Sequence, residues 1–368
     1  MRKYSWDFNY LMNLQNSYKV KLLNSNSDEE KKIFNDVIDQ LSIMMYTIIT
    51  SEGVVINEKI RHQFLLDSFR EQKSVEDYSA LTDLLVSDTL PLIAELEPIR
   101  NIKYKSNIEM DECIEVLGDA IKEVFGDKHY QIYLDYIKNR SGVIQLSNVV
   151  DSAYTTTIHV DDHDEHFMLL PRTNNFHMFS DFIHEVGHLY RMVNNEYNPL
   201  LDDKLYEFEA YYYQVKILEY FIENNIYVKE SIVALLEIFK SIERVAVLID
   251  ADKKFDLHSN FNIGNFKDLC AKIDLYDRAN IPNTLNLLEY LSYVYSRNIL
   301  NYIYSVLAVI EVKDRSDSRD IYEYITHNIG SVSSDEYVYK IFDDPITFNG
   351  LDKYKKFRGK ILDLSKNI

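Results

Sequence analysis

The sequence predicts a mostly α-helical protein of many helices with one small β-hairpin. Only 6 prolines and 9 glycines occur among 368 residues, whereas folds rich in β-turns need more of both. Apolar residues recur at three- and four-residue spacing through most of the chain, which is typical of amphipathic helices. The alternating pattern of a strand is confined to a short region that begins near residue 141. Helices should therefore supply most of the core.

The first 140 residues are predicted to be an N-terminal helical region. Residues 27–30, Ser-Asp-Glu-Glu, have the form of a capping box, and apolar residues follow at helical spacing from Ile33 to Ile48. Residues 74–77 open a second helix in the same way, and residues 111–125 form a third. No strand pattern and no repeat of fixed length interrupts this half of the chain.

A β-hairpin is predicted after residue 141. Residues 142–150 form a short segment with several β-branched side chains. Residues 154–160 and 167–171 are expected to be the two strands of the hairpin. The acidic and histidine-rich residues 161–166 are expected to form the polar turn between them. Asn174 or Asn175 should then cap the next helix.

From residue 202 to the end the chain is again helical. No linker rich in glycine, proline or serine divides it, so a soft boundary is expected just before the hairpin. The two regions would be residues 1–140 and 141–368, or one continuous domain. The expected helical segments of the second region cover residues 203–225, 228–250, 283–312, 318–329 and 351–366.

The charge of the chain excludes some functions. The net charge of −19 repels phosphate backbones, so nucleic acid is not an expected partner.

The sequence also bears on location. It contains no run of 18 apolar residues that could span a membrane, and residues 1–7 lack the apolar segment of a signal peptide. The chain has only two cysteines, so a fold stabilised by a set of disulfides is not expected. A cytoplasmic location is therefore expected, and no oligomeric state is predicted.

The most specific motif is His184-Glu185-Val186-Gly187-His188. Histidines four residues apart share one face of a helix and can bind a single ion. Catalytic zinc takes neutral imidazoles within a set of three protein ligands and keeps a fourth position open for water. Glu185 should lean toward that position and act as the base. The glycine suits a place where a substrate or a neighbouring backbone approaches closely.

The third zinc ligand is predicted on the next helix. Glu207 and Glu209 are two residues apart, so only one of them can face the zinc. Ala210 shares a helix face with Glu207, and such a small residue lets the two helices pack closely. Tyr212 and Tyr213 occupy the equivalent places beside Glu209. Glu207 is therefore the preferred ligand, and Glu209 stays open as the alternative.

Three further histidines, His159, His163 and His166, lie in or beside the acidic turn. They could form a second metal site, but a solvated hairpin turn is the preferred interpretation.

These motifs resemble those of the thimet oligopeptidase and oligoendopeptidase F family of zinc metallopeptidases. Residues 167–170 followed by 178–188 are similar to the family's edge strand and HExGH helix. Glu207 to Ala210 resembles its ligand glutamate followed by a small residue. Tyr293 to Ser296 resembles its late tyrosine cluster. The Glu-Phe-x-Ala string is also similar to that of toxin proteases of the lethal-factor type.

The resemblance implies a multi-helix, zincin-type metallopeptidase with a small sheet beside the active-site helix. Its channel would admit short unstructured peptides, which would add a strand to the sheet. The resemblance also implies that tyrosine hydroxyls stabilise the oxyanion, with Tyr295 the first candidate and Tyr293 the second. The family's histidine upstream of these tyrosines is missing, since residues 286–290 read Asn-Leu-Leu-Glu-Tyr.

The sequence thus predicts a zinc-dependent endopeptidase that cleaves short peptides by means of a metal-activated water. The residues expected to act are His184, His188 and Glu207 on the zinc and Glu185 as base. One alternative is a dedicated processing or toxin-type protease that cuts a single protein or precursor peptide. Another alternative is a helical sensor or binding protein that keeps the zincin scaffold without catalysis.

Overall fold

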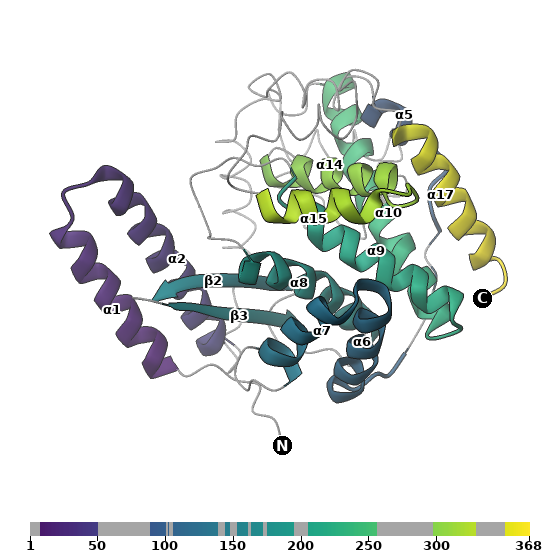
Figure 1. The fold of residues 1–368 in the computed structure, drawn as a ribbon. Helices are drawn as coiled ribbons and strands as arrows, with labels where there is room; N and C mark the ends of the chain where they lie inside the picture. Colours follow the sequence, from purple (N-terminus) through teal and green to yellow (C-terminus); the bar gives the residue numbers. More distant parts are fainter. Residues whose placement is uncertain are drawn as a thin grey trace.

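A computed structural model describes residues 8–50, 89–100, 102, 106–138, 144–147, 153–160, 163–171, 175–194, 205–255, 297–328 and 350–368. The mostly helical fold predicted from the sequence is confirmed in these residues (Figure 1). The helices are α1 (Phe8–Asn24), α2 (Asp28–Thr50), α5 (Leu90–Ala94), α6 (Met110–Phe125), α7 (Asp127–Tyr133), α8 (Phe176–Asn194), α9 (Phe208–Glu223), α10 (Val228–Phe255), α14 (Arg297–Val312), α15 (Ser318–Asn328) and α17 (Gly350–Ser365), with a π-helical segment at Leu134–Lys138.

The described strands form one sheet in the order β1-β3-β2. Strand β1 (Ile144–Ser147) runs parallel to β3 (His163–Pro171), and β2 (Tyr154–Val160) runs antiparallel to it. The predicted hairpin is therefore present, with an additional parallel strand at its side. Strand β2 lies at an edge of this described sheet.

The predicted turn at residues 161–166 is too long. Strand β3 begins at His163, which pairs with Val160, and His166 pairs with Thr157. Only two residues separate the paired Val160 and His163, as in the shortest hairpin connections. The polarity of residues 163–166 is typical of a turn, but backbone pairing with β2 continues through them.

The two faces of β3 pack against different parts of the molecule. Met168 and Leu170 point into the main core, whereas Phe167 and Leu169 belong to a smaller core shared with α1 and α2. This alternation follows from the two-residue period of a strand. Figure 1 shows the α1–α2 hairpin at one end of β2 and β3, beside the body formed by the other helices.

The main core runs from Leu90 to Ile361 and includes apolar residues from the described sheet and most helices. Helix α8 lies inside it and is buried on most of its surface, between the sheet on one side and α9 on another. A helix in this position holds its polar side chains in a fixed, largely dry environment.

Most of the predicted helices are present among the described residues. The Glu30 backbone amide donates to Ser27 Oγ over 3.3 Å at the start of α2, as expected of a cap. The predicted helix that opens at residues 74–77 lies outside the described residues. The predicted segment 283–312 is described only from Arg297, as α14. No described helix has the length and apolar character needed to cross a membrane.

Helix α9 begins later than the predicted residue 203. Its first residue is Phe208, and Leu205 to Glu207 form a turn before it. Glu207 is therefore at the N-cap position of α9 rather than inside the helix. This position is free of the steric limits of a helix interior, so the Glu207 side chain can turn toward α8.

Candidate metal centre

Helix α8 is fixed at its start by side chains outside it. The backbone amide of Met178 donates to Asn175 Oδ1 over 3.1 Å, and that of Phe176 donates to Ser106 Oγ over 2.8 Å. These bonds satisfy amides that have no partner within the helix. Asn175 is thus the cap among the two asparagines predicted. The cap sets the direction in which His184 and His188 project, two and three turns farther on.

Gly187 is the point of closest approach between α8 and α9. A Cβ at this position would stand 2.7 Å from the Ala210 Cα and 3.3 Å from the Glu209 carbonyl oxygen. Only glycine leaves room for the α9 backbone here. The close approach expected from the sequence at Gly187 and Ala210 is therefore present, and it carries Glu207 up to the two histidines.

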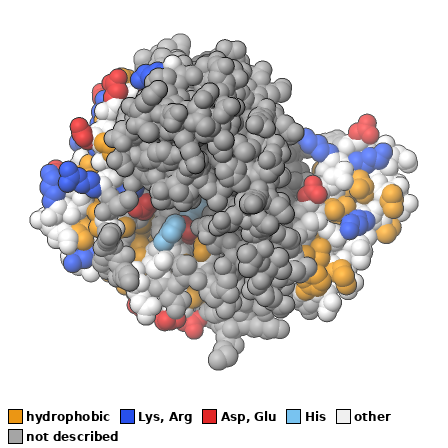
Figure 2. Space-filling model, turned by 180° about the vertical axis from the view of Figure 1, so that it is seen from behind, with side chains coloured by type: hydrophobic (Ala, Val, Ile, Leu, Met, Phe, Trp, Pro, Cys, Tyr) orange, Lys and Arg blue, Asp and Glu red, His pale blue; other side chains and the backbone are white. Residues whose placement is uncertain are grey.

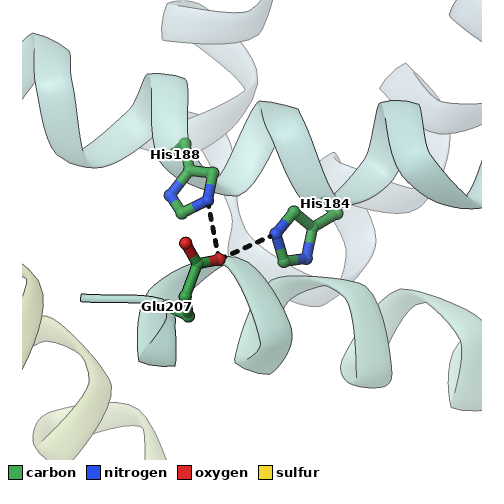
Figure 3. Close-up of side chains that lie close together, drawn as sticks. All are labelled: His184, His188 and Glu207. Carbon is green, nitrogen blue, oxygen red and sulfur yellow. Dashed lines mark hydrogen bonds and ion pairs between the residues drawn. The ribbon is translucent and has the colours of Figure 1, made fainter. Parts of the chain in front are cut away.

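Three side chains converge where these helices meet (Figure 3). Glu207 Oε2 lies 3.1 Å from His184 Nε2 and 3.0 Å from His188 Nε2. One ligand atom from each residue lies within 4.8 Å of the others. The ring planes of His184 and His188 are nearly perpendicular, at 86°. Among the described residues, this is the group of histidines and carboxylates that is arranged to hold a metal ion.

The outer nitrogen of His184 faces an amide that sequence reasoning did not identify. Gln214 Nε2 donates to the backbone oxygen of Ser180 over 3.0 Å and to its hydroxyl over 2.9 Å. This orientation leaves Gln214 Oε1 3.4 Å from His184 Nδ1. An amide oxygen only accepts hydrogen bonds, so Nδ1 of His184 carries the hydrogen.

The outer nitrogen of His188 faces Glu209, the alternative ligand predicted from the sequence. Glu209 Oε1 lies 3.0 Å from His188 Nδ1 and accepts a 2.6 Å bond from Arg191 Nε. Glu209 is fully buried and Arg191 is 5% exposed, and the guanidinium also stacks on Tyr206, 4.4 Å from the ring centre. Glu209 therefore orients His188 from behind, and Glu207 is the carboxylate on the inner side.

These contacts provide a test of whether the site fits a metal. With hydrogen on both Nδ1 atoms, neutral His184 and His188 each direct an Nε2 lone pair toward the oxygen of Glu207. Three acceptor atoms then converge in a buried site with no hydrogen between them. Such a group requires a positive charge, and two imidazoles with one carboxylate are a typical donor set for a divalent transition metal. The residues fit the ion.

The electrostatics of the metal-free protein agree with this description. Burial alone would raise the pKa of Glu207, but His188 and His184 hold it well below its ordinary value. Burial lowers the pKa of His188, but Glu207 and Glu209 outweigh it and hold this pKa well above the ordinary value. A proton on His188 therefore supplies positive charge that an incoming metal ion replaces.

Glu185, the predicted base, is 5% exposed, and its Oε2 has no hydrogen-bond partner among the described residues. Burial raises its pKa, against the opposing effects of His188, His184 and the Thr155 hydroxyl. Thr155 is paired with Met168, so it lies on the face of the sheet that looks toward α8. Glu185 is thus next to the three converging residues but is not one of them.

Two tyrosines outside the predicted set also belong to the site. Tyr302 on α14 donates its hydroxyl to Glu207, and this carboxylate is the main reason why the pKa of Tyr302 is well above its ordinary value. Tyr211 packs edge-on against His184 with ring centres 4.7 Å apart, and against Tyr302 at 6.1 Å. Tyr302 follows Tyr295 by seven residues in sequence, and this spacing was the signal that could have identified it.

The remaining predicted residues are placed as follows. Tyr293 and Tyr295 lie outside the described residues, as do the side chains of His159 and His163. His166 is 4% exposed and packs edge-on against Tyr136. It therefore contributes to the core rather than to a solvated turn.

A cavity of about 400 Å³ opens beside these residues. On the face shown in Figure 2, a histidine lies in a hollow next to acidic side chains. His184, Glu185, Tyr211, Gln214 and Tyr302 all line the cavity. A ligand in it would contact His184 and Glu185 of α8 and Tyr302 of α14.

Comparisons with known proteins identify the fold. No protein-family model and no curated protein sequence matches the chain. A crystal structure from Chlamydophila abortus, described as a peptidase, superposes with a TM-score of 0.52 at 14% identity, over 98% of this chain. One from Bacillus anthracis, described as an oligoendopeptidase F, superposes with a TM-score of 0.53 at 11% identity, over 99% of this chain. The chain therefore has the fold of oligoendopeptidase-type peptidases, with a His-His-Glu group in it.

The chain is shorter than both of these proteins. It covers 61% of the chlamydial chain and 70% of the Bacillus chain.

Proposed function

We propose that this chain is a zinc-dependent endopeptidase that hydrolyses short peptides. One observation carries the proposal: Nε2 of His184, Nε2 of His188 and Oε2 of Glu207 converge beside Glu185, a buried carboxylate with an oxygen that has no partner among the described residues. A structural metal site has no need of such a carboxylate, whereas hydrolysis needs a base at that place. The oligoendopeptidase-type fold supports the same activity.

Zinc is proposed as the metal on the basis of its ligands. Two imidazole nitrogens and one carboxylate oxygen form one of the common donor sets of catalytic zinc, which leaves a position open. Glu209 and Gln214 hold the outer nitrogens of the two histidines, and such outer contacts increase the basicity of the ligands. The metal would make a water more acidic and would withdraw electrons from the carbonyl oxygen of the substrate.

The side chains of the protein account for the proton transfers. Glu185 takes one proton from the attacking water at its free Oε2, as the water oxygen bonds to the carbonyl carbon. It then delivers this proton to the amide nitrogen as the carbon–nitrogen bond breaks, so the products are a carboxylic acid and an amine. Burial supports this role because it raises the pKa of Glu185 and makes the carboxylate a stronger base.

Tyr302 is proposed to donate a hydrogen bond to the substrate oxygen that becomes negative during the attack. Its hydroxyl already lies at Glu207, and Tyr302 is 36% exposed and lines the cavity. A tyrosine hydroxyl is protonated at neutral pH and can donate a hydrogen bond there. Tyr293 and Tyr295 stay as predicted alternatives for the same role.

The sheet supports the choice of peptides as substrates. Strand β2 lies at an edge of the described sheet, and its Thr155 faces Glu185. An extended peptide can pair with such an edge through its main chain. This pairing holds the scissile bond in place and does not depend on the side chains of the peptide. Folded proteins do not offer an extended segment of this kind.

Mass spectrometry of a diverse pool of short peptides tests the proposal. The pool is incubated with zinc-loaded wild type and with Glu185→Gln. Internal cleavage at many sites by wild type alone is the expected result. Cleavage at one or two sites would instead indicate a dedicated processing or toxin-type protease. Bound zinc without any cleavage by wild type would overturn the peptidase proposal in favour of a sensor or binding protein.

A further inference from the structure

The cavity beside the metal centre is lined by two helix faces that differ in character. Helix α8 contributes His177, Asp181 and Glu185 at intervals of one turn. Helix α10 contributes one stripe at three- and four-residue spacing, in which acidic and aliphatic residues alternate: Glu230, Val233, Ala234, Glu237, Ile238 and Ser241. No lysine or arginine is among the described residues that line the cavity.

Asp181 is a carboxylate of this cavity with little compensating charge. Its Oδ2 is inaccessible to solvent and has no hydrogen-bond partner in the part of the chain that the structure describes. Its Oδ1 lies 3.5 Å from Nδ1 of His177, a side chain that is 67% exposed. The other ionisable side chains that act on Asp181 are His184 and Glu185. Glu185 Oε2 is also buried and unpartnered in the same cavity.

A metal ion does not remove this excess of negative charge. Its protein ligands would be His184, His188 and Glu207, and Asp181 is not among them. Glu237 differs, because its Oε1 accepts a 2.6 Å bond from Lys240 Nζ. A cation supplied by a ligand would therefore gain a charge partner at Asp181.

The walls of the cavity also suit the stem of a long basic side chain. Val233, Ala234 and Ile238 offer an aliphatic surface between the acidic groups. Lysine and arginine bury their methylene stems against such surfaces and keep the charged group at a polar end. Asp181 is four residues from Glu185, or about 6 Å along the helix axis. A side chain next to the scissile bond can therefore reach it.

We infer that this cavity binds a lysine or arginine side chain of the peptide, and that Asp181 selects it. The inference rests on the proposed peptidase function and adds a class of substrate to it. Peptides with a basic residue near the scissile bond are bound in preference to peptides of the same length and shape without the charge.

Binding to zinc-loaded, full-length Glu185→Gln tests this inference without hydrolysis. Fluorescence anisotropy is measured with short labelled peptides, capped at both ends, in which one lysine is moved along the sequence. Each is matched with a peptide that has norleucine at that position. At one position the lysine peptide should bind about tenfold more tightly or better, as a charge-assisted hydrogen bond implies. Asp181→Asn should abolish this ratio and leave binding of the norleucine peptide nearly unchanged.

Asp119→Asn is the matched control, because Asp119 is exposed on α6 and the change in net charge is the same. It should preserve the lysine preference, which separates local selection from general attraction to an acidic protein. A norleucine peptide with a free amino terminus distinguishes a terminal ammonium from a side chain as the bound cation. Equal affinity for lysine and norleucine at every position in the Asp181-containing protein would overturn the inference, whether or not the wild type cleaves peptides.

Discussion

The Cα of Ala210 lies 2.7 Å from the point that a Cβ on Gly187 would occupy. This contact fixes the separation of α8 and α9. The separation in turn sets the distances from Glu207 to His184 and His188, because the three residues belong to these two segments. The geometry of the metal centre thus depends on the absence of a Cβ atom at Gly187.

Gly187→Ala should destabilise the protein and weaken metal binding. The new methyl group must push the two helices apart, and overpacking of this kind typically costs about 1–3 kcal/mol. Gly359→Ala in α17 is the control, since a Cβ at Gly359 would have no neighbouring atom within 4 Å; it should stabilise by up to about 1 kcal/mol through helix propensity. Thermal unfolding and zinc titration measure both effects. Unchanged zinc affinity in Gly187→Ala would contradict the role given to this contact.

Glu209→Gln should lower zinc affinity about 10- to 100-fold, as expected for the loss of a charged partner behind a ligand histidine. Arg191→Met should have a smaller effect in the same direction, because it acts through Glu209. Competition with a chromophoric chelator gives the affinities. Glu219→Gln removes another buried carboxylate, paired with Lys313 away from the site, and should affect stability only. Equal zinc affinity in Glu209→Gln and wild type would show that Glu209 does not position His188.

Tyr302→Phe should lower kcat about a hundredfold with little change in KM or zinc affinity. The hydroxyl is proposed to act on charge that develops during the reaction, so its loss affects the rate rather than ground-state binding. Tyr304→Phe removes a hydroxyl two residues away on the same helix and should retain the activity. If Tyr302→Phe keeps its full kcat, the oxyanion donor is another residue, and Tyr293 and Tyr295 are the next to be replaced.

His129 should make stability depend on pH in a defined window. It is 1% exposed, and burial lowers its pKa from 6.5 to about 4, although Glu323 Oε1 lies 3.0 Å from its Nε2. The unfolded chain therefore binds a proton that the folded chain resists. The free energy of unfolding is therefore unaffected by His129 protonation above pH 6.5. It falls as the pH falls toward 4, by about 3 kcal/mol at most.

The measurement is the change in unfolding free energy between pH 7 and pH 5 in wild type and in His129→Phe. The replacement retains an aromatic ring beside Tyr190, on which His129 stacks at 3.5 Å. Its stability should fall less over this interval than that of wild type. An identical fall in both proteins would mean that His129 does not titrate as described.

Sequence reasoning predicted which residues come together where their positions depend on local spacing. The histidines of α8 share a face because they are four residues apart, and this holds in any helix. The small Ala210 favours Glu207 as the third ligand, and that contact is present, although Glu207 lies at the N-cap rather than within the helix. Local pattern was sufficient in these places.

Residues that depend on contacts between distant segments were missed. Gln214 and Arg191 enter the site only because α8 and α9 pack at Gly187, and no spacing in the sequence specifies their partners. Tyr302 comes from α14, almost a hundred residues after Glu207 along the chain. The length of β3 was underestimated because the polar residues 163–166 have the composition of a turn. Their strand conformation depends on backbone pairing with β2, which the composition does not reveal.

The most direct test of the account is cleavage of a short-peptide pool before and after removal of the metal. We predict that wild type loses internal cleavage when a chelator strips the ion and regains it with one equivalent of zinc. Glu185→Gln should bind the same zinc and cleave nothing. Cleavage that survives chelation, or that persists in Glu185→Gln, would contradict the mechanism, and full zinc binding without cleavage by wild type would contradict the function itself.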